Sequence, residues 1–505
     1  MARNDIVFVK GNGANKRVAA GQDYISGLVL YSSVLPSGFT TTNNIKQLYS
    51  LQDAVNLGIN TTNSDETKAT ATYLVTNVGT DGNTLNISIT EPFGKIVDLC
   101  TYTKVTGDST VTKVGDAIAL LINNGTRTHG YTATAATGTV TITARTGLGV
   151  FLNSGTPITV TIVGSIAGTL TQFSGGVGSK LAVYHYHIAE FFRANPSGQL
   201  WVGIFPVPSP YTFAEITTLQ TAANGTLRQI GIYKDGAAYS SADLTAINTE
   251  VVLNNDAKHK PLSVLYAADL KATADITAIA DLYSLSANKV SSIISQDGVA
   301  LGATLFLSYG KSITNIGIAL GMLSKSAVSE DFGNPANFNL SDGTENDVPA
   351  FANGQLVSAL SENALDALDA KRHIFAQKYV GYAGTYFNDN HTAISTTSDY
   401  AYINDNRVID KAIRGIYSAL IPYLKGKVLY NADGTLASTT ISFYQNQALQ
   451  PLLQMSRDLD LGEVVADDVY IDPTQNVRST NTLTISVKLN ENGIARNILV
   501  PISFK

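Results

Sequence analysis

The sequence predicts a mixed α/β protein of several domains, in which a helix-covered sheet carries an inserted antiparallel β domain and extended strand arms at both ends. Three observations lead to this prediction. The chain of 505 residues is longer than one hydrophobic core usually supports. Short apolar stretches alternate with helical periodicity through residues 175–328, which is typical of parallel strands covered by helices. Residues 61–174 instead alternate apolar and polar positions between turn residues, which indicates antiparallel strands.

The N-terminal residues 1–26 are interpreted as a linking arm. A strand-like stretch is followed by a polar segment rich in Gly, a pattern typical of a mobile arm. The residues of this stretch are Asp5, Ile6, Val7, Phe8 and Val9. Because this end lacks the apolar core of a signal peptide, we expect the protein to fold in the cytosol. A strand is next expected at residues 27–33 and a short helix at residues 45–57.

Residues 61–174 are interpreted as an inserted β-rich domain, and the alternative is that they belong to the main core. Alternating stretches predict strands at residues 85–90, 110–114, 139–144 and 158–165, with one helix near residues 114–123. The single cysteine, Cys100, excludes an intramolecular disulfide and a cysteine zinc site. The whole chain is poor in charge, with 15% Asp, Glu, Lys and Arg, which suits large uncharged contacts.

Residues 27–60 and 175–345 are expected to form one α/β domain. Helices are predicted at residues 180–194, 213–223, 242–255, 273–285 and 305–325, and strands at residues 200–205, 228–233, 262–266 and 290–295. Residues 329–348 are polar and without periodicity, so they are interpreted as an exposed linker before a helix at residues 356–371.

Residues 346–490 are interpreted as a C-terminal core domain, and residues 491–505 as a second linking arm. An aromatic strand-like stretch covers residues 379–387, and the residues Asn404, Asp405 and Asn406 offer caps to a helix that runs to residue 424. A second helix is expected at residues 445–458, and strands at residues 463–471, 482–489 and 495–504. The apolar residues of the last strand are Ile498, Leu499, Val500, Ile502 and Phe504.

The C-terminal third also carries a resemblance to a known family. The stretches GYAGTYFNDNHTAIS and SDYAYINDNRVIDKAIRGIYSALIPYL are similar to the C-terminal core of contractile tail sheath proteins, which form the contracting tube of myophage tails and related injection machines. The similarity is sharpest over residues 374–424. It continues more loosely through VYIDPTQNVRSTNTLTISVKL and ARNILVPISF, and it does not reach the first third of the chain.

The resemblance implies a structural subunit rather than an enzyme. Such subunits stack as hexameric rings around a tail tube. The sheath contracts as its subunits rotate outward as nearly rigid bodies, which drives the tube through the host envelope, and no cofactor or nucleotide is needed. The implied partners are further copies of the chain, the tail tube protein, and the baseplate and tail terminator proteins, within a virion. Arms from neighbouring subunits complete a sheet in a third subunit, a β-augmentation.

The resemblance also implies that the helix beginning near Arg407 lies close to the tube. Its charged residues are then candidate contacts to the tube or to a neighbour, and the alternative is a solvated helix face. These residues are Arg407, Asp410, Lys411 and Arg414.

Other chemistry finds little support in the sequence. GGVGSK at residues 175–180 places Ser before Lys, the reverse of the phosphate-binding loop. His185 and His187 are two apart, so on a helix they cannot share a metal ion. The net charge of −6 argues against a general nucleic-acid binder. The alternatives left open are a sheath of a tailocin or injection system, a β-rich surface adhesin or carbohydrate-binding protein, and an α/β enzyme.

Overall fold

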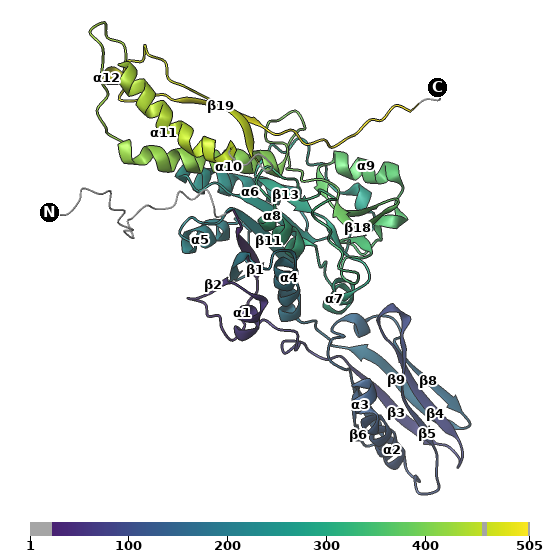
Figure 1. Ribbon diagram of the computed structural model, residues 1–505. Coiled ribbons are helices and arrows are strands. Elements are labelled where there is room, and N and C mark those ends of the chain that lie inside the picture. The colour runs from purple at the N-terminus through teal and green to yellow at the C-terminus, as the bar shows by residue number, and fades with distance from the viewer. Residues whose placement is uncertain (1–22, 457–461, 503–505) are drawn as a thin grey trace, which may run out of the picture.

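The molecule is elongated and has three parts (Figure 1). The computed structural model describes residues 23–456 and 462–502. An α/β domain lies at the centre, and an antiparallel β domain projects from one end of it. A lobe of two long helices and a two-stranded sheet, which we call the C-terminal lobe, covers the other end.

A seven-stranded sheet forms the middle of the α/β domain. Its strand order is β16-β13-β12-β11-β1-β10-β2, and all neighbours are parallel except β10 and β2. The strands are β1 (Ile25–Tyr31), β2 (Ile45–Leu48), β10 (Gln199–Phe205), β11 (Gln229–Ala238), β12 (Ser263–Asp269), β13 (Val290–Ile293) and β16 (His373–Ile374). β1 lies in the middle and is buried along its whole length, as expected of a parallel strand with both faces covered.

Helices cover both faces of the sheet, so alternate residues of a strand enter different cores. In β1, Leu28 and Leu30 pack with residues of α1, α4 and α8, whereas Val29 and Tyr31 pack with residues of α5 and α6. The helices of this domain are α1 (Leu51–Asn56), α4 (Lys180–Ala194), α5 (Glu215–Ala222), α6 (Ser241–Asn254), α7 (Leu301–Tyr309), α8 (Ile316–Lys325) and α9 (Glu362–Ala370). Two short hairpins add β14 (Ser295–Asp297) with β15 (Pro349–Phe351), and β17 (Ala376–Tyr379) with β18 (Tyr382–Phe387).

Helices α4 and α8 approach closely because α8 carries two glycines one turn apart. A Cβ atom at Gly321 would lie 2.6 Å from the backbone oxygen of Phe191, and one at Gly317 would overlap the backbone oxygen of His187. Backbone atoms cannot turn aside as a flexible side chain can. We therefore expect Gly317→Ala to lower the free energy of unfolding by about 1–3 kcal/mol, the usual cost of overpacking.

A urea titration of the two proteins measures this difference. Gly107→Ala is the matched control, because nothing lies within 4 Å of a Cβ atom at Gly107. An unchanged midpoint for Gly317→Ala would show that the two helices can separate without cost.

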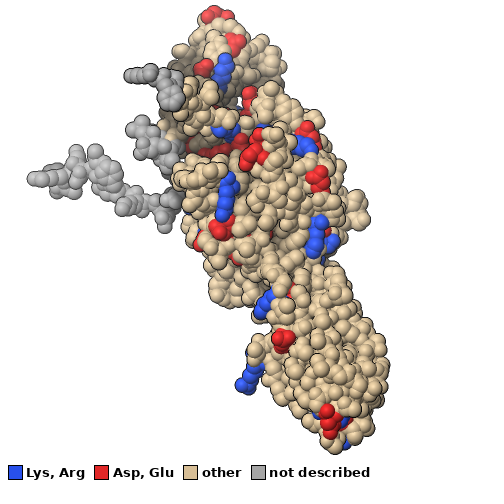
Figure 2. All heavy atoms as spheres, turned by 90° about the vertical axis from the view of Figure 1, so that its right-hand side faces the viewer, with Lys and Arg blue, Asp and Glu red and all other residues tan. Residues whose placement is uncertain are grey.

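The inserted domain has two sheets and a core of its own. A four-stranded sheet of order β6-β7-β3-β9 faces a three-stranded sheet of order β5-β4-β8, and alternate residues of β4 (Leu85, Ile87 and Ile89) are fully buried in this core. The elements are β3 (Thr70–Val78), β4 (Thr84–Thr90), β5 (Ile96–Thr103), α2 (Val111–Asn124), α3 (Thr126–His129), β6 (Thr132–Ala136), β7 (Thr139–Thr143), β8 (Ile158–Val163) and β9 (Ile166–Ser174). Figure 2 shows few charged side chains on this domain.

The two connections of the inserted domain run side by side. Thr67 and Val177 exchange backbone hydrogen bonds of 3.0 and 2.8 Å, so the chain closes on itself where the domain begins and ends. One further backbone contact to the α/β domain runs from the Val150 N–H to the Ser308 carbonyl, at 2.8 Å.

The C-terminal lobe is built on two packed helices. It contains α10 (Ile403–Leu420), α11 (Ser438–Ser456), β19 (Val464–Tyr470), α12 (Val477–Thr480) and β20 (Ser486–Glu491). Its small apolar core joins residues of α10, α11 and β19 to Val328 of the α/β domain. The strands β19 and β20 are antiparallel and form a sheet of two strands.

The predicted mixed α/β, multidomain class is confirmed, whereas several elements differ from the prediction. Residues 45–57 form β2 and then α1, because Ser50 and Asp53 make a capping box that starts the helix at Leu51. Thr110 caps α2, so residues 110–114 are not a strand. Residues 305–325 lie in two helices, because α7 ends at Gly310 with φ of +78°.

Two segments owe their structure to distant contacts. Residues 273–285 contain one 3-10 turn, Ile276–Ala278, instead of a helix. Ile276, Ile279 and Leu282 are buried all the same. Residues 329–348 are not an exposed linker, because Phe332, Phe338 and Leu340 enter the main core. The predicted caps Asn404, Asp405 and Asn406 lie inside the first turn of α10, whose N-cap is Tyr402.

Candidate functional site

The N-terminal end of the described chain is bound to helix α10. The Asp23 carboxylate lies 2.9 Å from the Lys411 Nζ and 3.1 Å from an Arg414 nitrogen. The Ser324 hydroxyl donates to the Tyr24 carbonyl at 2.9 Å. The described chain therefore begins, at Asp23, beside α10. The predicted strand from Asp5 to Val9 belongs to residues 1–22. That strand itself lies outside the described residues.

The four charged residues predicted to contact a tube or neighbour face the interior of this chain. Arg407, Asp410 and Arg414 are buried, and the Lys411 side chain is 12% exposed. Arg407 donates to the Ser326 hydroxyl at 2.8 Å and to the carbonyls of Ser326 and Ala327 at 3.2 Å. The alternative of a solvated helix face is therefore wrong, and in this conformation these charges offer little surface to another molecule.

Asp410 belongs to a buried ion cluster under α10. Its carboxylate lies 2.6 Å from the Lys289 Nζ, and Asp256 lies 3.4 Å from the same nitrogen. Burial raises the pKa of Asp256 to about 6, although Lys289 opposes this rise. One ammonium thus serves two carboxylates in a region of low dielectric.

The exposed side of α10 is apolar, which the sequence did not lead us to expect. Ile413 and Tyr417, one turn apart, are 43% and 40% exposed, and Ile421 and Leu424 continue this side beyond the helix. Tyr417 stacks on His259, with ring centres 4.2 Å apart.

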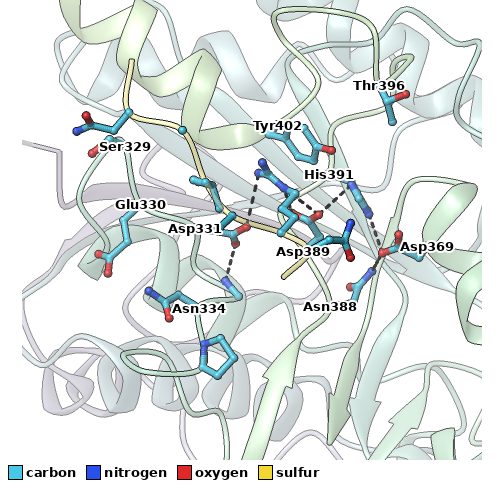
Figure 3. A pocket seen from close by; sticks show the side chains of 18 of the residues that line it. Ser329, Glu330, Asp331, Asn334, Asp369, Asn388, Asp389, His391, Thr396 and Tyr402 are labelled. Atoms are coloured by element: carbon cyan, nitrogen blue, oxygen red, sulfur yellow. Dashed lines mark hydrogen bonds and ion pairs between the residues drawn. The ribbon is translucent and has the colours of Figure 1, made fainter. Parts of the chain in front are cut away.

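The C-terminal segment passes over a cavity of about 700 Å³. The cavity lies between residues 327–335, the residues around Asp389, and residues 492–497. Figure 3 shows Asp331 and Asp389 pointing toward one guanidinium group, which is that of Arg496. Acidic side chains also gather between the C-terminal lobe and the α/β domain in Figure 2.

Arg496 fixes the root of the C-terminal arm. Its Nε lies 3.1 Å from both carboxylate oxygens of Asp389, and a terminal nitrogen lies 3.2 Å from the Asn390 side-chain oxygen. The guanidinium lies 3.4 Å from the centre of the Tyr402 ring, a favourable cation–π contact. Sequence reasoning missed this residue, although it is the sole charged residue between Glu491 and Lys505.

Beyond Arg496 the arm leaves the molecule. Ile498, Leu499, Val500 and Ile502 are 81%, 91%, 66% and 90% exposed, and residues 492–502 form no strand. The strand predicted at residues 495–504 is thus not formed within the described residues, because its backbone meets no partner there; Phe504 lies outside them. Figure 1 shows this segment extending away from the body of the protein.

The sheet of β19 and β20 has open edges near this root. It consists of two strands, so within the described chain each strand has one edge without a strand partner. Val487 and Leu489 pack on the core of the lobe. Ser486, which precedes them, and Lys488, which lies between them, are exposed. Such an edge can accept a strand from another chain.

The cavity has more carboxylates than cations, which predicts a pH dependence of stability. Burial raises the pKa of Asp331 to about 8, with Asp389 adding to the rise. Glu491 directly precedes the cavity residue Asn492, and burial together with Asp405 raises its pKa to about 7. Between about pH 4 and pH 8 the folded chain therefore binds more protons than the unfolded chain, so stability falls as the pH rises, by up to about 1.4 kcal/mol per pH unit for each proton.

Thermal unfolding of Asp331→Asn and wild type from pH 5 to pH 9 measures this effect. We expect the stability of the variant to fall less steeply with rising pH than that of wild type. At pH 9 the variant should be the more stable protein. Asp347→Asn is the control, because the Asp347 side chain is 49% exposed and pairs with Lys378. Parallel curves for Asp331→Asn and wild type would contradict the prediction.

Features that suggested other chemistry have structural roles. The Asp65 carboxylate accepts hydrogen bonds from the backbone N–H groups of Lys180 and Leu181 at 2.8 and 3.1 Å, and so fills the helix end where a phosphate would bind. His187 is buried, and burial lowers its pKa to about 3.

Within the described ranges, no three His, Cys, Asp or Glu residues are grouped to hold a metal ion, and no helix is long and apolar enough to cross a membrane.

Comparison with known proteins gives two family matches. The model for the DUF2586 N-terminal domain matches residues 110–391, and that for the DUF2586 C-terminal domain matches residues 399–505. No curated protein matches the chain.

Solved structures similar to the chain include contractile sheath proteins. The contracted helical sheath of the anti-feeding prophage is 16% identical, with 63% of this chain and 81% of that chain covered and a TM-score of 0.43. The contracted PVC sheath of an extracellular contractile injection system is 11% identical, with 63% and 80% covered and a TM-score of 0.40. The sheath tail protein of Listeria innocua is 10% identical, with 94% and 97% covered and a TM-score of 0.35. They belong to the group of proteins that the sequence resembles.

Proposed function

We propose that this chain, which belongs to the DUF2586 family, is the structural subunit of a contractile tail sheath. The observation that carries the proposal is the C-terminal arm. Residues 498–502 are apolar and exposed and pair with no strand of the described chain. The root of the arm is held by Arg496, and the arm lies in the part of the sequence that resembles sheath proteins.

The arm has the properties of a strand that pairs with another subunit. Ile498, Val500 and Ile502 lie two residues apart, so in a strand they share one face. Burying three such side chains contributes about 1.5–3 kcal/mol each, and added backbone hydrogen bonds contribute further. The open edges of β19 and β20 offer a matching acceptor, so a chain of arms and sheets would join subunits into a mesh.

The assembly that we propose is a helical stack of hexameric rings around a tail tube. A head-to-tail contact that does not close within one ring generates such a polymer. Contraction would then move subunits between two packings separated by a kinetic barrier, driving the tube through the host envelope while the arms keep neighbours connected. The partners are further copies of the chain, the tube protein, and baseplate and terminator proteins, and no enzymatic step or cofactor is part of this mechanism.

The same mechanism serves a phage tail in a virion, a tailocin or another contractile injection system. These differ in what the tube delivers and not in what the sheath subunit does. In each of them we propose assembly in the cytosol of the producing cell.

Electron microscopy of the purified full chain at high concentration tests the proposal. Striated tubes or stacked rings are the expected result. A chain that remains monomeric over a wide range of concentration and salt, by light scattering as well as in micrographs, would contradict it.

A further inference from the structure

We propose that the acidic cavity under the C-terminal segment binds a basic side chain from residues 1–22 of a second copy of this chain. The inference rests on the proposed function, because it gives the cavity a role in joining subunits. It adds a charged contact to the pairing of strands, at the point where the C-terminal arm begins.

Two carboxylates of the cavity share one cation of this chain. Arg496 contacts Asp389 at 3.1 Å and Asp331 at 3.7 Å, so two carboxylates share one guanidinium. The second arginine of the wall, Arg372, is buried and donates to the backbone carbonyls of Thr392 and Ala401. Two adjacent carboxylates with one cation favour the uptake of a proton or of a second cation.

A buried acceptor without a partner points to the same ligand. His391, 3% exposed, lines the cavity and places its Nε2 2.9 Å from the Asp369 carboxylate. In the neutral imidazole this nitrogen carries the proton, and Nδ1 is then an acceptor. Nδ1 has no hydrogen-bond partner among the described residues, and the nearest carboxylate, that of Asp389, lies 3.9 Å away. An ammonium or guanidinium group in the cavity would donate to this nitrogen and to the carboxylates.

The N-terminal segment is a suitable source of that cation. Residues 1–22 contain the four basic residues Arg3, Lys10, Lys16 and Arg17 and one acidic residue, Asp5, whereas the whole chain has a net charge of −6. A segment of this length can extend about 70–80 Å, which is enough to reach a neighbouring subunit.

The position of the cavity favours binding to a second copy. β20 (Ser486–Glu491) runs directly into residues 492–497, which form the roof of the cavity. A strand added along the free edge of β20 would therefore end at the cavity. Arg3 and Lys10 flank the apolar stretch from Ile6 to Val9, so one of them would lie at that end.

Cross-linking between two full-length variants tests the proposal. Both carry Cys100→Ser, which removes the single cysteine. One carries Asn4→Cys or Asn12→Cys beside the basic residues, and the other carries Ser329→Cys at the cavity. After mixing and mild oxidation we expect a disulfide dimer on a non-reducing gel. Ser165→Cys, on an exposed turn of the inserted domain, replaces Ser329→Cys in the control and should give none.

Removal of either charge should lower the dimer yield about fivefold, the ratio that corresponds to about 1 kcal/mol. Asp331→Asn removes a negative charge from the cavity, and Arg3→Gln with Lys10→Gln removes two positive charges from the segment. Asp347→Asn lies outside the cavity and should not change the dimer yield. Equal yields in all variants would overturn the proposal. So would the absence of any disulfide dimer between the two variants.

Micrographs of the wild-type chain and of the cross-linked samples separate this proposal from the sheath function. Tubes without a cross-link between chains would refute the cavity contact and leave the sheath function standing. A charge-dependent cross-link without any polymer would support the contact and count against the sheath.

Discussion

Removal of residues 498–505 is expected to leave a folded subunit that no longer forms tubes. The truncation keeps Arg496, so the contacts with Asp389 and Tyr402 remain. Among the removed residues, Ile498, Leu499, Val500 and Ile502 are exposed, so the fold of the subunit should lose little. Circular dichroism and thermal unfolding should match the full chain, while electron microscopy should show dispersed subunits.

Point variants refine this expectation. Ile498→Ser with Val500→Ser changes one face of the arm, whereas Leu499→Ser changes the other. Polar substitutions on the face that packs against the neighbouring sheet should prevent the formation of tubes. Polar substitutions on the opposite face should only make the tubes less stable. Tubes of normal diameter from the truncated chain would remove the arm from the proposed linkage.

Replacement of Lys289 by Met should destabilise the C-terminal lobe by about 3–5 kcal/mol, the usual result of removing one partner of a buried ion pair. Lys289 is buried and is paired with Asp410 at 2.6 Å and with Asp256 at 3.4 Å. Met keeps most of the side-chain volume but leaves both carboxylates without their cation. Hydrogen exchange of the α10 amides, followed in urea, measures the change in the lobe itself.

Lys378→Met provides the control for that measurement. Its pair with Asp347 spans 3.5 Å, and both side chains are nearly half exposed, so the expected cost is about 0–1 kcal/mol. Similar effects of the two substitutions would mean that the cluster under α10 is reached by water and is not part of what holds the lobe in place.

The sequence was sufficient where local pattern and burial agree. Residues 180–194 form α4, and the strand expected at residues 200–205 is β10, because continuous apolar stretches suit a sheet covered on both faces. It was insufficient where distant contacts decide the structure. Residues 329–348 have the composition of a linker, yet Phe332 and Phe338 enter the main core, which no local pattern reveals.

The candidate site shows the same limit. The apolar arm could be predicted, because Ile498, Val500 and Ile502 alternate as in a strand at the very end of the chain. The burial of the charged residues of α10 could not be predicted. Helical spacing shows which residues share a face, but it does not show which part of the protein that face contacts. Asp410 meets Lys289, which lies 121 residues earlier, and Arg496 meets Asp389, 107 residues earlier.

The backbone pairing of Thr67 with Val177 has a practical consequence for engineering. The chain enters and leaves the inserted domain at one place. The α/β domain therefore requires only that the two ends of the insertion lie close together. Residues 68–176 could therefore be exchanged for another folded module whose ends lie equally close together. In a helical polymer, each such exchange would display one copy of a chosen enzyme, tag or binding protein per subunit, in a regular array.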